Sequence, residues 1–235
     1  MSQNDIISAA QSAGRQLLTE VESKQLLSQA GIETNETLLA KSKEEAIELS
    51  RQIGFPAVLK IASPDVVHKS DAGGVKIGLT NEAEVGQAYD DILAAIGSAY
   101  PTTQVDGISV QAMAQPGVEV IMGVSIDPQF GPVLMFGLGG ILVEVLKDVA
   151  FRIAPLTQRD AAQMIREIKG YPILEGHRGQ KPVDVSALEN SLLKLSRFVE
   201  ERPMIRELDL NPVIAYSDGL TVVDARIVLE NADAS

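Results

Sequence analysis

The chain has 235 residues, a formal net charge of −12 and no cysteine. The lack of cysteine excludes disulfides, thiolate metal sites and cysteine nucleophiles, while the acidic charge and the few aromatic residues argue against a general nucleic-acid binder. The length is sufficient for one large domain or for two small lobes around a cleft.

The N-terminal residues predict no signal peptide, because a basic segment followed by a long apolar run is missing there. No stretch approaches the roughly 20 apolar residues that are needed to span a bilayer. We therefore expect a cytoplasmic protein without a membrane segment.

Apolar periodicity and turn signals predict alternating helices and strands in the first half of the chain. The predicted helices cover residues 1–30, 42–53 and 81–100. The predicted strands cover residues 32–39, 57–61 and 75–79. A polar, glycine-containing loop over residues 63–74 separates the last two strands.

The second half of the chain is richer in strand patterns. Predicted strands cover residues 107–113, 117–126, 133–137, 141–146, 206–215 and 220–224. Predicted helices cover residues 159–169 and 186–200. The mixture indicates an α+β chain of two lobes, residues 1–100 and residues 101–235, because the β-rich part begins after Tyr100.

Two segments of the first half carry residues that could bind phosphate. Lys60 interrupts an apolar strand, where it either extends its stem to water at a sheet edge or holds a phosphate as a point charge. His68 lies beside Lys69 in the polar loop and precedes the pair Gly73–Gly74. It is either a surface histidine or a nucleophile that carries a phosphoryl group, whose charge the glycine amides would offset.

Oxygen-bearing side chains on strands of the second half suit a nucleotide and a metal ion. Glu119 lies between apolar residues, where it either faces solvent or accepts hydrogen bonds from a ribose diol. Strand alternation places Glu207, Asp209 and Asn211 on one face, and a hairpin would bring Asp224 back beside this row. Such a row suits Mg²⁺, although a solvated strand face has the same pattern.

Several common motifs are missing from the sequence. It contains neither the Gly-x-x-x-x-Gly-Lys-Ser/Thr phosphate loop nor the Gly-x-Gly-x-x-Gly dinucleotide fingerprint, and no Gly-x-Ser-x-Gly elbow. The two histidines lack the His-Glu-x-x-His context of zinc hydrolases. These absences argue against the corresponding nucleotide-binding and hydrolase classes.

Taken together, several strings resemble the ATP-grasp part of ADP-forming acetyl-CoA synthetases, a family related to the beta subunit of succinyl-CoA synthetase. The strings are residues 55–61, 63–75, 117–119, 127–132, 136–140, 148–155 and 209–212. The resemblance implies an ATP-grasp fold whose two lobes clamp a nucleotide, with Mg²⁺ bridging its phosphates.

The resemblance also implies roles for individual residues. The residues implied to bind ATP or ADP are Lys60, Gly73, Gly74, Gln111, Met113, Glu119 and Arg152. Among these, Lys60 would contact the phosphates, Glu119 the ribose, and residues 110–113 the adenine edge through their backbone. Asn211 and Asp224 would bind Mg²⁺, while His68 and Asp209 would be catalytic.

In the family, a CoA-binding subunit makes an acyl phosphate and passes the phosphoryl group through two histidines to ADP. His68 matches the second histidine, whereas His177 matches no such role and is expected to be structural. The implied reaction is acyl-CoA + ADP + phosphate ⇌ carboxylic acid + ATP + CoA, with acetate as the expected acid. The chain has no room for CoA-binding and ligase domains, so a separate CoA-binding alpha subunit and a hetero-oligomer are implied. The alternative is that the chain is a fragment of a fused enzyme.

Two other functions fit parts of the pattern. A carboxylate–amine ligase of the ATP-grasp type would be complete in itself and would not need a histidine relay. A regulatory ATP-grasp module would bind ATP or ADP without turnover. Phosphate that stays covalently bound to this chain distinguishes the synthetase subunit from both.

Overall fold

The computed structural model describes residues 3–66, 69–140, 147–176, 179 and 181–230. The chain divides into two compact units. Unit 1 comprises Met1–Leu18, Glu22–Thr34 and Pro116–Ser235, and unit 2 comprises Thr19–Val21 and Asn35–Gln115.

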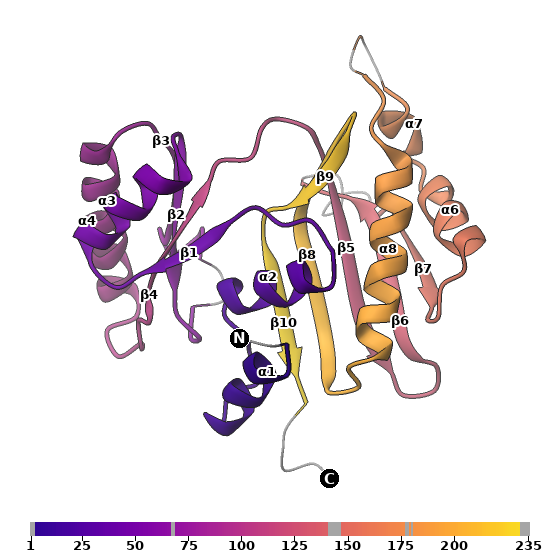
Figure 1. Ribbon diagram of the computed structural model, residues 1–235, viewed down its shortest axis with the longest axis horizontal. Helices are drawn as coiled ribbons and strands as arrows, with labels where there is room; N and C mark the ends of the chain where they lie inside the picture. The colour runs from indigo at the N-terminus through magenta and orange to yellow at the C-terminus, as the bar shows by residue number, and fades with distance from the viewer. Residues whose placement is uncertain (1–2, 67–68, 141–146, 177–178, 180, 231–235) are drawn as a thin grey trace. The chain divides into compact units, whose positions relative to one another are not determined.

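Among the described residues, unit 2 contains an antiparallel four-stranded sheet in the order β1-β4-β2-β3. The strands are β1 (Thr37–Ala40), β2 (Ala57–Ala62), β3 (Val75–Leu79) and β4 (Gly107–Ala112). The helices α3 (Lys43–Ile53) and α4 (Glu82–Ala99) lie together on one side of this sheet (Figure 1). These elements confirm the helices predicted at 42–53 and 81–100 and the strands predicted at 57–61 and 75–79.

The two helices of unit 2 begin and end at residues whose chemistry suits those places. The side chains of Ser42 and Asn81 accept hydrogen bonds from the third backbone N–H of α3 and α4, respectively. Gly54 ends α3 with a φ of 95°, which favours glycine over other residues. Apolar residues of β2 such as Leu59 and Ile61 pack with Ile92 and Ile96 of α4 in one core.

Gly74, directly before β3, is a position where a larger residue does not fit. A Cβ atom on Gly74 would lie 2.6 Å from Cγ2 of Ile61 and 3.0 Å from the carbonyl oxygen of Lys69. We expect Gly74→Ala to destabilise the chain by about 1–3 kcal/mol, because the neighbouring side chain and backbone must shift. Thermal denaturation measures this effect as a lowered melting temperature.

Gly97, inside α4, provides the matched control for the substitution at Gly74. A Cβ atom there meets nothing within 4 Å, and alanine favours a helix by about 0.5–1 kcal/mol over glycine. Gly97→Ala should therefore raise the melting temperature. Equal effects of the two substitutions would contradict the close packing around Gly74.

Unit 1 contains an antiparallel sheet of six strands within the described residues, in the order β10-β8-β5-β6-β7, with β9 also paired to β8. Its strands are β5 (Val118–Asp127), β6 (Gly131–Leu138), β7 (Val149–Ile153), β8 (Ile205–Tyr216), β9 (Gly219–Val222) and β10 (Ala225–Leu229). Its helices are α1 (Gln3–Ser12), most of α2 (Glu20–Gln29), α6 (Gln158–Glu167), α7 (Tyr171–Leu174) and α8 (Val185–Glu200). Figure 1 shows α6 and α8 beside the β6–β7 part of this sheet.

Strand alternation divides the sheet of unit 1 into an apolar and a more polar face. Leu208 and Leu210 of β8 are buried in the core with Phe136 of β6 and Phe198 of α8. The residue between the two leucines, Asp209, therefore faces the other way and is only partly buried. The predicted separation of apolar and oxygen-bearing residues along β8 is confirmed.

Some parts of the observed secondary structure differ from the sequence prediction. Residues 1–30 form two helices, α1 and α2, instead of one continuous helix, and the strand expected over 32–39 is the shorter β1. The strands β7 and β10 and the short helix α7 were not predicted. The strand expected over residues 141–146 lies outside the described residues.

The limits of the two units also differ from the expected division after Tyr100. Strand β4 follows that residue but pairs with both β1 and β2, which binds it to unit 2. The N-terminal residues before Thr19 belong to unit 1, because Leu17 and Leu18 bond to β10. Long-range strand pairing, which sequence patterns do not reveal, sets both limits.

No helix among the described residues combines the length and the apolar character that crossing a bilayer would require.

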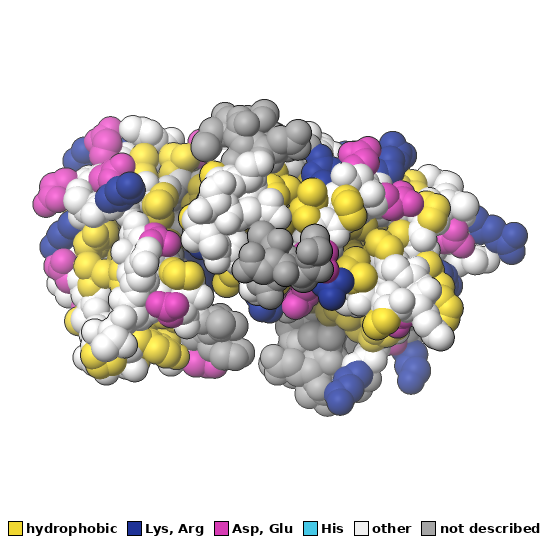
Figure 2. All heavy atoms as spheres, turned by 90° about the horizontal axis from the view of Figure 1, so that it is seen from below, with side chains coloured by type: hydrophobic (Ala, Val, Ile, Leu, Met, Phe, Trp, Pro, Cys, Tyr) yellow, Lys and Arg dark blue, Asp and Glu magenta, His cyan; other side chains and the backbone are white. Residues whose placement is uncertain are grey.

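In the view of Figure 2, Lys and Arg side chains are scattered among Asp and Glu side chains on the described surface. This distribution agrees with the acidic composition and differs from the basic surface of a nucleic-acid binder.

Candidate functional site

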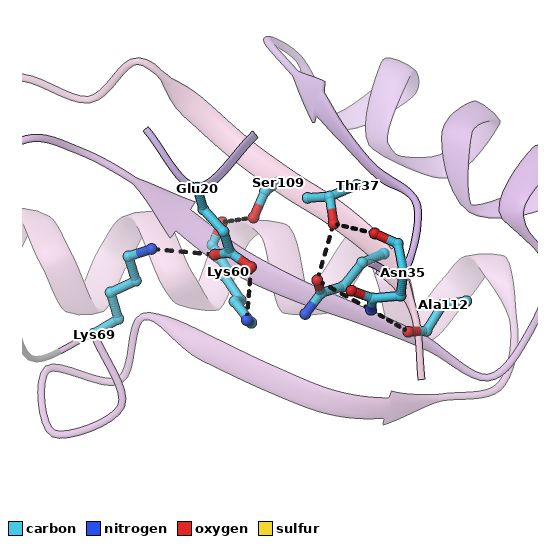
Figure 3. Close-up of polar contacts among 8 residues, drawn as sticks. Glu20, Asn35, Thr37, Lys60, Lys69, Ser109 and Ala112 are labelled. Carbon is cyan, nitrogen blue, oxygen red and sulfur yellow. Dashed lines mark hydrogen bonds and ion pairs between the residues drawn. The ribbon is translucent and has the colours of Figure 1, made fainter. Parts of the chain in front are cut away.

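Lys60 is a buried residue of an interior strand. β2 lies between β4 and β3, and the Lys60 side chain is 7% exposed. Its Nζ donates to Oε1 of Glu20 at 2.8 Å, and Nζ of Lys69 donates to Oε2 of the same carboxylate at 3.2 Å (Figure 3). The alternative of an edge lysine extending to water is therefore wrong.

The glycine pair closes the end of the polar loop. The N–H of Gly74 donates to the carbonyl of Lys69 at 2.7 Å, and the N–H of Gly73 donates to that of Ser70 at 3.1 Å. Both N–H groups are therefore already bonded within the loop. This bonding argues against the expectation that they offset the charge of a phosphate. The expectation for His68 lies outside the described residues, as does that for His177.

Gln111 and Met113 occupy different positions at the end of β4. The side-chain oxygen of Gln111 accepts hydrogen bonds from Asn35 at 3.3 Å and Thr37 at 3.1 Å, and its backbone lies between β1 and β2. Gln111 is therefore held inside the sheet. Met113 follows β4 with an exposed side chain, and its N–H donates to the carbonyl of Pro56 at 3.0 Å.

Glu119 lies in unit 1 against a turn of two glycines. Its side chain is exposed, and its carbonyl accepts a hydrogen bond from the N–H of Gly139 at 2.7 Å. A Cβ atom on Gly140, whose φ is 62°, would approach Oε2 of Glu119 to 2.9 Å. The glycines thus leave room for the carboxylate, which is accessible to a ligand as the ribose role requires.

The polar row on β8 consists of Glu207, Asp209 and Asn211, and Asp224 lies beside it where the chain returns after β9. Asp224 does not end a strand as predicted, because it lies between β9 and β10. Its carbonyl accepts a hydrogen bond from the N–H of Asn211 at 3.2 Å, and Arg226 is the cross-strand neighbour of Asp209. The predicted proximity of Asp224 to Asn211 and Asp209 is therefore observed.

The electrostatics of this row favour a cation. Burial raises the pKa of the Asp209 carboxyl above its ordinary value, Glu207 and Asp224 raise it further, and Arg226 lowers it. Arg226 is also ion-paired to Glu207 at 3.3 Å. A divalent cation bound nearby would relieve the repulsion among these carboxylates.

The donors fit an open magnesium site better than a closed protein cage. Within the described parts of the chain, no group of three or more His, Asp or Glu side chains is arranged to hold a metal ion. Asn211 and Asp224 would supply two oxygens, and Mg²⁺ commonly takes its other ligands from water and nucleotide phosphates.

The raised pKa of Asp209 gives a test of this electrostatic description. A raised carboxyl pKa means that the charged form of Asp209 is disfavoured in the folded state. The charge therefore lowers the stability of the fold, fully at a pH above the raised pKa and not at all below the ordinary value of 3.8. We expect Asp209→Asn to raise the melting temperature at pH 7 without metal by up to about 3 °C, allowing for partial solvent screening. The gain should shrink as the pH falls towards 4.

The control for this measurement is Asp218→Asn in the exposed turn between β8 and β9. It removes the same charge from the same hairpin and should leave the melting temperature unchanged. A melting temperature of Asp209→Asn below that of the unmodified chain at pH 7 would contradict the description.

Arg152 lies away from the polar row. Its cross-strand neighbour Leu134 belongs to the core of unit 1, and its guanidinium is ion-paired to Glu167 of α6. It thus points to the helix-covered face, where it lines an open pocket of ≈ 450 Å³ with Arg159 and Arg166. Asp209 is on the opposite face, so the structure does not bring Arg152 together with the other expected site residues of unit 1.

Two charged residues of these sites were missed by sequence reasoning. Glu20, which contacts Lys60 and Lys69, is 40 residues from Lys60 in sequence, and its position in a helix gave no sign of this partner. Arg226 belongs to the strand that was not predicted, so its ion pair with Glu207, a member of the predicted row, was not foreseen.

Two units that each contain an antiparallel sheet, one with a buried lysine and the other with the polar row, agree with the ATP-grasp class of nucleotide-binding proteins. A model of the ATP-grasp domain family matches residues 9–229, and the chain belongs to this family. The chain is 48% identical over 225 residues to the beta subunit of the ADP-forming acetate–CoA ligase I of Pyrococcus furiosus, covering 96% of this chain and 97% of that protein.

Solved structures agree with this assignment. The dinucleotide-forming acetyl-coenzyme A synthetase 1 of Ca. Korarchaeum cryptofilum, in complex with coenzyme A, Ca-AMPCP and HgCl⁺, has a TM-score of 0.96 and 51% identity, covering 97% of this chain and 100% of that chain. The same enzyme with coenzyme A and Mg-AMPPCP, its phosphohistidine segment pointing towards the nucleotide-binding site, has a TM-score of 0.87 and 49% identity, with the same coverage. The expected fold and family are confirmed.

Proposed function

We propose that this chain is the nucleotide-binding subunit of an ADP-forming acyl-CoA synthetase, with acetyl-CoA as the expected substrate. The observation that carries the proposal is its likeness, over nearly the whole length of both chains, to a beta subunit of an ADP-forming acetate–CoA ligase. The relative's designation as a beta subunit supports a separate, CoA-binding alpha subunit as the partner.

The residues of unit 2 suit the phosphate end of ADP. Lys60 and Lys69 bring two ammonium groups to one carboxylate, and such groups also attract phosphate oxygens as point charges. Met113, exposed at the end of β4, would lie beside the adenine. Gly73 and Gly74 would shape the loop, and Gln111 would support the strand, instead of contacting the nucleotide directly.

The residues of unit 1 suit the ribose and the metal ion. The accessible carboxylate of Glu119 would accept hydrogen bonds from the ribose diol. Asn211 and Asp224 would hold Mg²⁺, which screens phosphate charge when bound, and Asp209 would add negative charge to its surroundings.

His68 would carry the phosphoryl group between the partner subunit and ADP. In the first step, a new P–N bond to the His68 imidazole forms as the bond to the partner's histidine breaks. In the second step, a terminal β-phosphate oxygen of ADP attacks the phosphorus, the P–N bond of His68 breaks, and ATP leaves with neutral imidazole restored. The loop that contains His68 continues into Lys69, whose ammonium would offset phosphate charge.

The test is a reconstitution of the chain with the CoA-binding alpha subunit, supplied with acetyl-CoA, ADP, phosphate and Mg²⁺. We expect formation of ATP, acetate and CoA in equal amounts, and mass spectrometry should find an acid-labile phosphate on this chain. Nucleotide binding without turnover would instead indicate a regulatory module. Turnover that requires an amine acceptor would indicate a carboxylate–amine ligase.

A further inference from the structure

Glu20 is a buried carboxylate whose two oxygens bind different lysines of unit 2. Its side chain is 3% exposed, compared with 7% for Lys60 and 22% for Lys69. Removal of a carboxylate from water is unfavourable unless cationic or other hydrogen-bond donors replace the solvent. The carboxylate and the two lysines therefore hold one another in place.

The geometry of this cluster fixes the relation between two ammonium groups. Lys60 comes from the middle of β2, whereas Lys69 comes from the polar loop, and Glu20 begins α2. Oε1 of Glu20 accepts a hydrogen bond from Nζ of Lys60 at 2.8 Å, and Oε2 accepts one from Nζ of Lys69 at 3.2 Å (Figure 3). Both ammonium groups are thereby held at one carboxylate, an arrangement that would suit different oxygens of a single phosphoryl group.

The contact to Lys69 also anchors the start of a closed turn. This turn ends at Gly74, whose N–H bonds back to the carbonyl of Lys69 at 2.7 Å. The carbonyl of Gly74 accepts a hydrogen bond from the N–H of Ile61 at 2.7 Å, one residue beyond Lys60 on β2. The turn is thus fixed to β2 at one end and to Glu20 at the other, and His68 directly precedes it in sequence.

We infer that Glu20 is a positioning residue for the phosphoryl relay, a role that rests on the proposed function. Its carboxylate fixes the positions of the Lys60 and Lys69 ammonium groups. Lys69 is also the residue that directly follows His68 in sequence. It acts through these residues and does not touch the phosphoryl group itself. Misplacement of reacting groups by about 1 Å lowers a rate by about 100-fold.

The anchoring is tested without any turnover, by amide hydrogen exchange of the complete chain. We expect Glu20→Gln to speed exchange at the N–H groups of Gly73 and Gly74 by about tenfold, because the turn opens more often. The matched control is Glu22→Gln in the same helix, where the carboxylate pairs with Arg15 at 2.8 Å. Unchanged exchange in Glu20→Gln, or equal changes in both variants, would overturn the anchoring.

The positioning is tested in the assembled synthetase by ATP formation at varied ADP. Glu20→Gln should lower kcat by about 100-fold and raise KM for ADP by a smaller factor, Glu20→Asp should recover part of the rate, and Glu22→Gln should keep it. A wild-type kcat in Glu20→Gln would overturn the role. If the unmodified assembly makes no ATP, the proposed function fails, while hydrogen exchange still decides the anchoring.

A variant that fails to fold would be replaced by Glu20→Gln combined with Lys60→Met. Removal of both partners of the more buried pair, Glu20 and Lys60, is often neutral for stability. Lys69 also loses the Glu20 carboxylate in this variant, but its side chain is 22% exposed and its ammonium can be hydrated. This double variant should fold, and exchange at the N–H groups of Gly73 and Gly74 should be as fast as expected for Glu20→Gln. Wild-type exchange in the double variant would overturn the anchoring, whereas its kcat does not bear on Glu20 because Lys60 itself is assigned to the phosphates.

Discussion

Replacement of His68 by alanine is expected to lower ATP formation by the assembled synthetase at least about 10⁴-fold, because loss of a covalent nucleophile removes the intermediate that joins the two steps. Binding of ADP should change little, since the nucleotide contacts assigned to Lys60 and Glu119 remain. The measurements are steady-state ATP formation with the partner subunit and ADP affinity by calorimetry.

His177→Ala provides the matched control, since His177 is the other of the two histidines in the sequence. It should retain both ATP formation and the acid-labile phosphate on the chain. Wild-type turnover in His68→Ala would remove the relay from this residue. Loss of turnover in both variants, together with a lowered melting temperature, would point to a general effect on folding.

The helices and strands that could be predicted are those whose signals are local. Ser42 and Asn81 cap helices where the sequence placed their starts, and Gly54 ends a helix as expected. The apolar residues that alternate with Asp209 along β8 are buried as predicted. Each of these features depends on residues within one or two turns of the chain, which is the range that a sequence pattern covers.

The features that could not be predicted depend on partners far apart in sequence. β7 contains Ala150 in the core beside the exposed Phe151, so its apolar residues lie on both faces and give no clear alternation. The direction of Arg152 follows from the pairing of β7 with β6, which the sequence does not contain. Arg152 was accordingly expected at the phosphate, whereas the structure places it beside α6.

The sequence therefore indicated unusual residues more readily than the contacts that these residues make. Lys60 was recognised as unusual because a charge in an apolar strand is unfavourable without a partner. That partner, Glu20, became visible only in the folded chain. Similarly, the glycines before β3 were noticed as a pair, but the lack of space around Gly74 explains the second one by packing.

Asp224→Asn is expected to raise the Mg²⁺ concentration for half-maximal ATP formation at least about tenfold, equivalent to about 1.4 kcal/mol of lost binding. The substitution keeps one oxygen donor and the approximate shape while it removes the charge that attracts the cation. Maximal activity should return in part at high Mg²⁺, because the nucleotide phosphates and water would still supply ligands. A Mg²⁺ titration at saturating ADP measures both quantities.

The appropriate comparison is Asp218→Asn, which changes the net charge equally at the exposed turn of the same hairpin. A shift confined to Asp224→Asn would assign the effect to a local ligand, since long-range attraction of Mg²⁺ by the acidic chain would be weakened similarly in both variants. Identical titrations for Asp224→Asn and the unmodified chain would remove Asp224 from the metal site. Asn211, whose backbone N–H bonds to Asp224, would then be the remaining expected ligand, to be tested by Asn211→Ala in the same titration.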